Sequence, residues 1–490
     1  MNTLSLFPDS KVDNTDPRYD TLVRGFNLRW VGNPEFVEVV GTAEQVQQAV
    51  GDAVNQNMRI TVRGGGHCYE DFVSDNDGGV IIDLSGLDGV YEDEENDMIV
   101  VEGGCTLWNV YSQMYKNWGV TIPGGSCYSV GVGGHVCGGG YGLLSRLHGL
   151  TVDYLAGVEV VVVDENRNAQ IVTAFKDREN DDLFWAHTGG GGGNFGVITK
   201  YFFQDLPTAP KNAWLANVAW DWCELDQAKF GTIVRQYGEF FKQNTGVEYN
   251  GLFALLHLSH ISAKQIVLTA QYVGDQPELL DEFINAMQVD DVSHVRQLYS
   301  VGYHHHIRAD TTSQELPWFY MTQTLNGSGP NRRGKYKSAY MREPFPDRQI
   351  PIMFKWLTDC NYDNSQALLQ VDSYGGQINA VDKKATAAVH RDSILKLQYQ
   401  TYWTEDIKEG QPNPHLDWIR GFYTEMYKDY PLSDDYFDGC YVNYPDVDLG
   451  PWQELYYGDN YSRLQDVKKQ WDPHNIFHHR QSIELRPGTG

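Results

Sequence analysis

Long apolar runs are missing from this sequence. No segment approaches the roughly 18–20 consecutive apolar residues that a membrane-spanning helix needs. The strongest run, 158–163, is interrupted by Glu159 and is typical of a buried strand. The start, MNTLSLFPDS, has neither a basic region nor a long apolar stretch, so we see no secretory signal. These absences predict a cytoplasmic protein without a membrane partner.

Basic residues are also scarce. The 38 lysines and arginines face 65 acidic residues, which gives a net charge of −27. Such a surface repels nucleic acid and anionic membranes, so we expect no nucleic-acid partner. Any bound diphosphate should rest on backbone N–H groups rather than on a cluster of basic side chains.

Cysteine and metal-ligand patterns are sparse. Seven cysteines in 490 residues do not make a disulfide framework. The histidine triplet at 304–306 has no cysteine or carboxylate at ligand spacing, so we predict no metal site. Apolar residues make up 41% of the chain, and its 490 residues are too many for one compact core. We therefore expect two domains, or one domain with a large insertion.

The first part of the chain has an α/β pattern. Residues 36–40 and 59–63 are expected strands, and the second leads into Gly64-Gly65-Gly66-His67. Thr42 followed by Gln45 fits a helix capping box. The helix after it shows one apolar face, formed by Val46, Ala49, Val50, Ala53 and Val54. This pattern predicts a β-α-β unit whose second strand ends in a glycine turn.

Two hairpins are predicted next. The first joins residues 80–84 to 98–102, with the acidic stretch 92–97 as a solvated turn. The second joins 158–164 to 169–173, with turn residues between them. After 206–210 the pattern changes to long mixed segments, such as a strand over 265–272 and a helix over 277–286, which we interpret as a second domain.

Many of the 49 glycines are gathered in three clusters, at 63–67, 123–142 and 189–196. Glycine allows positive φ angles, and successive N–H groups then form a concavity that binds anions. One cluster alone would fit a tight turn at a sheet edge, but three favour a large, phosphate-bearing cofactor. A dinucleotide motif can be forced onto 189–196, yet 182–187 is not a clear strand, so NAD binding is rejected.

Four motifs carry a family resemblance: RGGGHCYEDF, PGGSCYSVGVGGHVCGGGYG, DDLFWAHTGGGGGNFGVIT and YVNYPD…YYGDNYSRLQDVKKQWDPHNIF. Together they resemble the berberine-bridge-enzyme-like flavoproteins of the vanillyl-alcohol-oxidase superfamily, most of all the bacterial sugar and secondary-metabolite oxidases. The resemblance implies an α+β, two-domain fold. An FAD domain would span 1–207 and 435–490, and a substrate domain, an antiparallel sheet covered by helices, would be inserted at 208–434.

The resemblance also implies an FAD attached at two points. The histidine after the triple glycine, His67, would bond the flavin 8α-methyl carbon, and Cys127 would bond flavin C6. A thiolate is a strong nucleophile that can add to an electron-poor ring. Taken alone, His67 could be a histidine in a turn, and Cys127 could be a small buried apolar side chain. The other expected cofactor contacts are Arg63, Gly64, Gly65, Gly66, Gly124, Val130, Gly133, Gly134, Gly139, Gly140, Gly142, Gly193, Val197 and Asn443.

Tyrosines match the family's catalytic positions. Tyr141 resembles an active-site tyrosine near the flavin ring, and Tyr441 and Tyr444 resemble the pair on its substrate side. A base must take a hydroxyl proton as hydride leaves, and one of that pair is expected to do so, with a slight preference for Tyr444. Tyr69 matches an aromatic residue that contacts substrate.

Gln370 and Asp372 share one face of an expected strand by their i, i+2 spacing. In relatives the matching segment faces the flavin and can carry an acid or an amide, and an acid beside a tyrosine could orient it or accept its proton. A half-exposed strand edge explains the pattern equally well.

The leading interpretation is an oxidase that acts on an alcohol or hemiacetal of a carbohydrate or secondary metabolite. Val130 matches a position that influences oxygen access in relatives, and its small size implies O2 as acceptor and H2O2 as product. Oxidative C–H functionalisation or cyclisation is the alternative. Intact Tyr141, Tyr441 and Tyr444 disfavour a flavin-binding protein without turnover. The expected partners are a small-molecule substrate and O2, in a monomer or homodimer.

Overall fold

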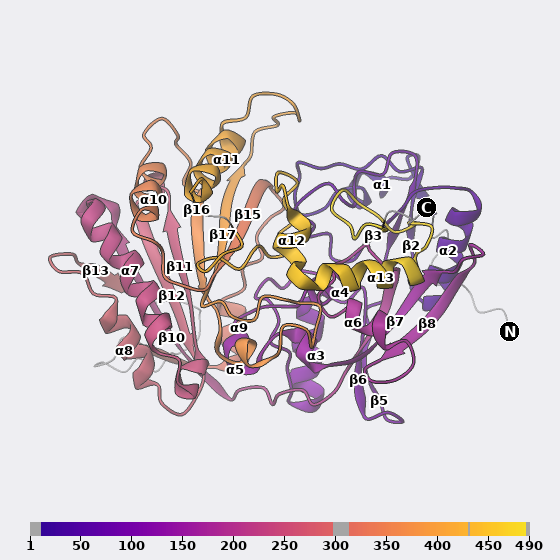
Figure 1. Cartoon of the computed structure of the whole chain (residues 1–490), viewed down its shortest axis with the longest axis horizontal. Coiled ribbons are helices and arrows are strands. Elements are labelled where there is room, and N and C mark those ends of the chain that lie inside the picture. The colour runs from indigo at the N-terminus through magenta and orange to yellow at the C-terminus, as the bar shows by residue number, and fades with distance from the viewer. Residues whose placement is uncertain (1–10, 297–312, 430–431, 487–490) are drawn as a thin grey trace.

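Three β-sheets organise the described part of the chain, residues 11–296, 313–429 and 432–486 of the computed structural model. Two smaller sheets come from the first 203 residues and lie side by side, and the third, much larger sheet stands next to them (Figure 1). The histidine triplet at 304–306 lies outside the described residues.

The first sheet contains the predicted β-α-β unit. Its order is β1 (Lys11–Asp13), β2 (Phe36–Val39), β4 (Val80–Asp83) and β3 (Ile60–Arg63). Helix α2 (Ala43–Asn55) connects β2 to β3 and buries its apolar face. Thr42 caps this helix by accepting a bond from the Gln45 amide at 3.2 Å. The Gln45 side chain, however, accepts from the Gly41 N–H at 2.7 Å, one residue before the position a capping box requires.

The predicted hairpin between 80–84 and 98–102 is wrong. Strand β4 pairs in parallel with both β2 and β3, whereas β6 (Met98–Glu102) belongs to the second sheet. All four residues of β4 are buried, as expected for a parallel strand covered on both faces. An apolar run of that length has the same appearance in a hairpin, so the sequence pattern could not separate the two.

The second sheet has the order β5-β6-β9-β7-β8. Its remaining strands are β5 (Val90–Asp93), β7 (Leu155–Val163), β8 (Ala169–Phe175) and β9 (Val197–Phe203). The predicted second hairpin is confirmed, because β7 and β8 pair antiparallel from Gly157 to Val163. The expected turn at 92–97 begins only after β5 ends at Asp93.

The large sheet is antiparallel, in the order β13-β10-β12-β11-β16-β17-β15, with β14 also paired to β10. Its strands are β10 (Asn212–Asp221), β11 (Leu252–Ser259), β12 (Gln265–Tyr272), β13 (His294–Arg296), β14 (Gln314–Pro317), β15 (Arg333–Met341), β16 (Leu368–Ser373) and β17 (Leu395–Trp403). The strand predicted over 265–272 is β12, and the helix predicted over 277–286 is α8 (Glu278–Ala286).

One face of this sheet is covered by helices. They are α7 (Gln227–Gln243), α8, α10 (Gln349–Leu357) and α11 (Pro414–Tyr427), on the outer side in Figure 1. Leu369 and Val371 of β16 are fully buried in the apolar core between sheet and helices. Because side chains alternate along a strand, the residues between them point to the opposite face, toward the two smaller sheets.

The C-terminal segment returns to the first part of the chain. Helices α12 (Trp452–Tyr457) and α13 (Tyr461–Trp471) run back across the molecule, and α13 contacts α6 (Asp181–Ala186) (Figure 1). The buried Lys468 ammonium anchors this return by donating to the Asn194 and Phe477 carbonyls, both at 2.6 Å. Within the ranges described, no helix has the length and apolar character needed to cross a membrane.

Candidate functional site

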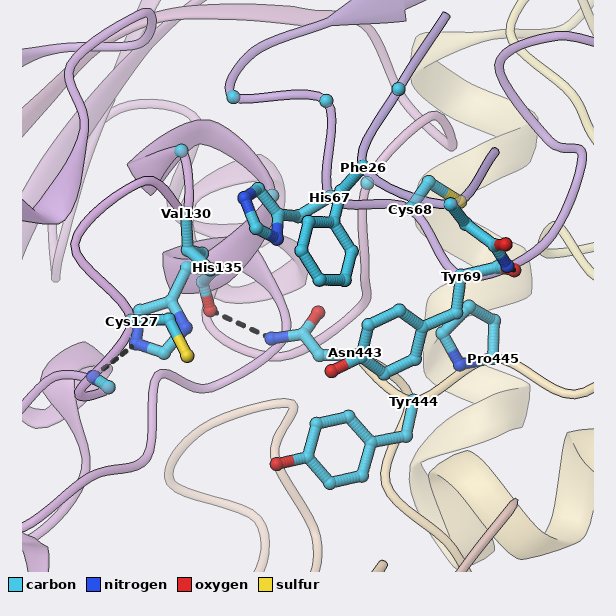
Figure 2. A pocket seen from close by; sticks show the side chains of 18 of the residues that line it. Phe26, His67, Cys68, Tyr69, Cys127, Val130, His135, Asn443, Tyr444 and Pro445 are labelled. Atoms are coloured by element: carbon cyan, nitrogen blue, oxygen red, sulfur yellow. Dashed lines mark hydrogen bonds between the residues drawn. The ribbon is translucent and has the colours of Figure 1, made fainter. Parts of the chain in front are cut away.

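A cavity of about 940 Å³ lies where the three sheets meet. This volume is at the upper end of the roughly 300–1,000 Å³ typical of small-molecule sites. Its lining combines the loop after β3, the segments 125–135 and 191–198, strands β11, β16 and β17, and the segment 441–445. Figure 2 shows His67 and Cys127 in this cavity together with Tyr69 and Tyr444.

Most of the predicted site residues line this one cavity. They are Arg63, Gly64, Gly65, Gly66, His67, Tyr69, Cys127, Val130, Gly133, Gly134, Tyr141, Gly142, Gly193, Val197, Gln370, Asp372, Tyr441, Asn443 and Tyr444. Three predicted cofactor contacts, Gly124, Gly139 and Gly140, are not among the lining residues. They instead pack close to neighbouring segments, as at Gly140, where an added Cβ would lie 2.5 Å from the Thr151 Cβ.

His67 is held on two sides. Its ring stacks on Phe26 with centroids 4.5 Å apart and 16° between the planes (Figure 2). Its Nε2 is 2.9 Å from the Ser129 hydroxyl. Burial lowers the pKa of His67 from 6.5 to about 4, so the imidazole is neutral near pH 7 and keeps a lone pair for bonding.

Cys127 lies in the loop before α4 (Val132–Cys137). Burial raises the pKa of its thiol, whereas the Ser126 hydroxyl, the Arg332 guanidinium and a backbone bond from Gly327 act in the opposite direction. Gly327 approaches so closely that a Cβ there would be 2.9 Å from the Cys127 sulfur. Burial has the larger effect, so the pKa is raised overall, and the three polar groups partly offset this increase.

The lining fits a flavin nucleotide. Gly65 and Gly131 bring two loops into direct backbone contact, since a Cβ on Gly65 would be 2.3 Å from the Gly131 nitrogen. Gly66 and Gly193 both adopt φ = +72°, a conformation that favours glycine. The Arg63 side chain is engaged by Asp83, with Nε 3.5 Å from Oδ2, and bonds to the Leu22 carbonyl. Phosphate groups would therefore meet mainly backbone, with a nucleophilic imidazole and thiol in the same cavity.

Lys396 lies at the centre of the tyrosine cluster. Its ammonium is 3.0 Å from the Tyr444 hydroxyl oxygen and 3.0 Å from Asp372 Oδ2, and the side chain is completely buried. The same nitrogen lies 4.2 Å from the ring centre of Tyr444, 4.6 Å from that of Tyr141 and 5.3 Å from that of Tyr441. One buried cation therefore contacts all three predicted tyrosines.

Burial raises the pKa of the three tyrosines above the usual value near 10. Asp372 adds to the increase at Tyr444 and Tyr141, whereas Lys396 opposes it at Tyr441. Tyr441 also accepts a hydrogen bond at 2.9 Å from Asn443, which donates to the His135 carbonyl as well (Figure 2). The three tyrosines beside Lys396 are therefore neutral phenols near pH 7.

Next to this cluster, amide side chains form a continuous row on the sheet, which we call the amide row. Gln370 donates to Asp372 at 2.7 Å and accepts from Gln400 at 3.1 Å. Gln398 accepts from Gln400 at 2.9 Å and donates to the Tyr69 hydroxyl at 3.1 Å. The predicted shared face of Gln370 and Asp372 thus points into the cavity, not to a half-exposed edge.

Four further residues line the cavity or contact its polar groups and were not predicted from the sequence: Lys396, Gln398, Gln400 and His257. A signal was present: in β17 the polar residues 396, 398 and 400 alternate with Leu395, Leu397 and Tyr399. All these positions are buried, so this alternation separates two interior faces rather than core from solvent. In the ranges that the structure describes, no cluster of three or more histidine, cysteine or acidic side chains is arranged to hold a metal ion.

Comparison with known proteins agrees with this geometry. The family described as "FAD binding domain" matches residues 34–166, and the family described as "Berberine and berberine like" matches 440–484. The hexose oxidase of Chondrus crispus is 39% identical over 97% of this chain and 94% of its own. The aclacinomycin-N/aclacinomycin-A oxidase of Streptomyces galilaeus is 39% identical over 96% and 89%.

Among solved structures, CrmK, a flavoenzyme of caerulomycin biosynthesis, superposes with a TM-score of 0.90 at 40% identity. The match covers 97% of this chain and 99% of CrmK, and it confirms the predicted α+β fold with an inserted antiparallel sheet. The cofactor of the family is FAD. Taken with the full-length relatives, these matches show that the chain belongs to the berberine-bridge-enzyme-like FAD-dependent oxidases of the vanillyl-alcohol-oxidase superfamily.

Proposed function

We propose that this enzyme oxidises an alcohol or hemiacetal carbon of a carbohydrate, or of a sugar-bearing metabolite, and forms H2O2. The amide row is the observation that carries the proposal. Gln370, Gln398 and Gln400 supply amide donors and acceptors on one cavity wall, beside the Tyr69 hydroxyl. Their mutual bonds use only part of this capacity, because each amide has two N–H donors and two acceptor lone pairs, and a substrate with several hydroxyl groups can bond to the remainder.

The tyrosine cluster supports a role in proton removal. We assign the base to Tyr444, because the Lys396 ammonium donates directly to its oxygen and so favours the phenolate over the phenol. Asp372 holds Lys396 from the other side at 3.0 Å. Tyr441 is the second candidate, since Lys396 lowers its pKa against the effect of burial.

When bound, FAD supplies N5 as the hydride acceptor and passes the electrons to O2. We further propose that His67 and Cys127 hold it covalently, at the 8α-methyl carbon and at C6. The neutral His67 imidazole and the polar surroundings of the Cys127 thiol support this assignment. Two bonds at separate points of one ring would fix its position in the cavity.

The test is H2O2 release from purified enzyme across a panel of mono- and oligosaccharides and glycosylated metabolites. Release in proportion to sugar consumed supports the proposal. Turnover confined to non-sugar metabolites would favour C–H functionalisation or cyclisation instead. The covalent bonds are tested separately by acid precipitation, because flavin left wholly in the supernatant would show that neither bond forms.

A further inference from the structure

A short segment of the inserted domain closes over both proposed flavin-linking residues. This segment, residues 326–332, follows α9 (Trp318–Thr324) and precedes β15; we call it the clasp. The Asn326 side chain accepts from the Tyr128 amide at 3.1 Å. The Ser328 hydroxyl accepts from the Ser129 amide at 3.0 Å and lies 3.0 Å from the Ser129 hydroxyl.

These contacts continue to His67. The hydroxyl of Ser129 that meets Ser328 also meets His67 Nε2, so the chain Ser328–Ser129–His67 consists of hydrogen bonds of 3.0 and 2.9 Å. When Nε2 carries the proton and donates to Ser129, the lone pair of the imidazole is on Nδ1. Because a hydroxyl can donate or accept, the chain fixes the orientation of the ring and accommodates the tautomer that keeps its lone pair on Nδ1.

The clasp reaches His67 from the other side as well. Its last residue, Arg332, donates its N–H to the Phe26 carbonyl at 3.1 Å, and its carbonyl accepts from the Leu28 N–H at 3.1 Å. Phe26 is the ring on which His67 stacks. Both residues that support the imidazole, Phe26 through its carbonyl and Ser129 through its hydroxyl, are therefore hydrogen-bonded to the same segment.

Cys127 lies under the middle of the clasp. Gly327 has no side chain, and a Cβ there would approach the Cys127 sulfur to 2.9 Å. The Arg332 guanidinium stacks on the Tyr402 ring at 3.6 Å, which holds it in place on the sheet side. Its positive charge favours the thiolate, the form of cysteine that forms bonds.

We propose that the clasp is a positioning device through which the inserted domain prepares His67 and Cys127 for attachment to FAD. Ser328 sets His67 through Ser129, and Gly327 leaves the space that the Cys127 sulfur needs. This inference rests on the covalent attachment proposed above. Each attachment breaks one flavin C–H bond and one protein N–H or S–H bond, and forms one C–N or C–S bond. The two protons and two electrons released each time reduce one O2 to H2O2.

The experiment measures which residue carries flavin, not activity. Wild-type enzyme and the variants Ser328→Ala and Gly327→Ala are denatured, and their intact masses are measured by mass spectrometry. Proteolytic peptides that carry flavin are then identified, which shows whether His67 or Cys127 is modified. Total flavin of the native proteins is read from absorbance. The expected pattern is selective. Ser328→Ala should raise the fraction without the His67 bond by about tenfold, since misplacing a reacting group by about 1 Å costs on the order of 100-fold in rate. Gly327→Ala should do the same for the Cys127 bond.

Thr232→Ala is the matched control, since Thr232 donates its hydroxyl to the Ala228 carbonyl within helix α7, and it does not line the cavity. It should leave both bonds complete. If Ser328→Ala carries as much flavin on His67 as the wild type, and Gly327→Ala as much on Cys127, the proposed role of the clasp is wrong. The proposed covalent attachment would still stand. Equal loss of both bonds in every variant, Thr232→Ala included, would also overturn it, because that pattern reflects general destabilisation. Wild-type protein without any covalent flavin would overturn the attachment proposal together with the clasp.

Discussion

The two ends of the cavity are built on different principles. At the glycine-rich end, backbone of short contiguous segments forms the wall, and each segment is one sequence motif. At the sheet end, side chains form the wall, and they come from alternate positions of β11, β16 and β17, which are distant in sequence. We propose that the first end holds the cofactor, and side chains at the second end can then vary without altering it.

The difference has a physical basis. A substitution at Gly65 would drive a Cβ to within 2.3 Å of the Gly131 backbone, and backbone cannot move aside as a flexible side chain can. On the sheet, exchanging Gln400 changes the groups presented to substrate but not the strand that carries them. Substitutions at the sheet end should therefore alter turnover and leave bound flavin unchanged, and the predictions below test that separation.

The largest effect is expected for Tyr444→Phe. The variant keeps the ring and loses the hydroxyl that accepts from Lys396. Loss of a general base lowers turnover about 10²- to 10⁴-fold, so kcat should fall by that amount while the flavin content per protein stays unchanged. Tyr441→Phe is the matched variant. A greater loss of kcat in Tyr441→Phe than in Tyr444→Phe would transfer the role of base to Tyr441.

A smaller loss, about 10- to 100-fold in kcat, is expected for Lys396→Met. The side chain keeps its length, but the phenolate of Tyr444 loses its positive neighbour. The pH at which kcat reaches half its maximum should move upward, since a phenol without a nearby cation ionises at higher pH. Removing the lysine also leaves the buried Asp372 unpaired, which can destabilise the fold.

Lys396→Met combined with Asp372→Asn separates the two effects. It removes the unpaired charge, so thermal stability should recover while kcat stays low. Recovery of kcat together with stability would show that Lys396 acts only by holding the fold.

Substrate recognition should respond more weakly to Gln400→Leu. This amide bonds to both Gln370 and Gln398 and accepts from the Tyr402 hydroxyl at 2.8 Å, so its loss disturbs the amide row and Tyr402 but removes no bond of the tyrosine cluster around Lys396. Losing a polar contact costs about 1–3 kcal/mol, so KM for the best sugar should rise roughly tenfold with kcat nearly unchanged. Gln236→Leu, at a half-buried position of α7 outside the cavity lining, is the control and should change neither constant. A fall in kcat at constant KM would place Gln400 in the chemical step.

The same contrast explains how much the sequence could predict. His67, Cys127 and the three tyrosines lie in contiguous motifs, and all of them line the cavity. Their chemical roles stay predictions. Lys396 stands in no motif; it becomes part of the site only because β17 pairs with β16 and places it opposite Asp372. Pairing between distant strands is set by tertiary packing, which also explains why 80–84 was assigned to the wrong partner.

The smallest effect concerns stability at the glycine-rich end. His187, between α6 and the third glycine cluster, is 2% exposed, and its Nδ1 lies 2.8 Å from the Leu183 carbonyl. Burial lowers its pKa from 6.5 to about 4 in the folded protein. The unfolded chain therefore binds an extra proton between these values, so stability is complete above pH 6.5 and declines as the pH falls toward 4. By pH 5 the loss from this one group is about 2 kcal/mol.

Thermal unfolding of the holoenzyme between pH 7 and pH 4.5 measures this dependence. His187→Gln removes the titrating group, so its midpoint temperature should fall less steeply with acid than that of the wild type. The difference should be only a few degrees, because a chain of this size has a large unfolding entropy. His474→Gln is the control, since His474 is exposed on the surface and should leave the slope unchanged. Parallel curves for wild type and His187→Gln would mean that His187 is protonated in the folded enzyme, or that it reaches solvent before the protein unfolds.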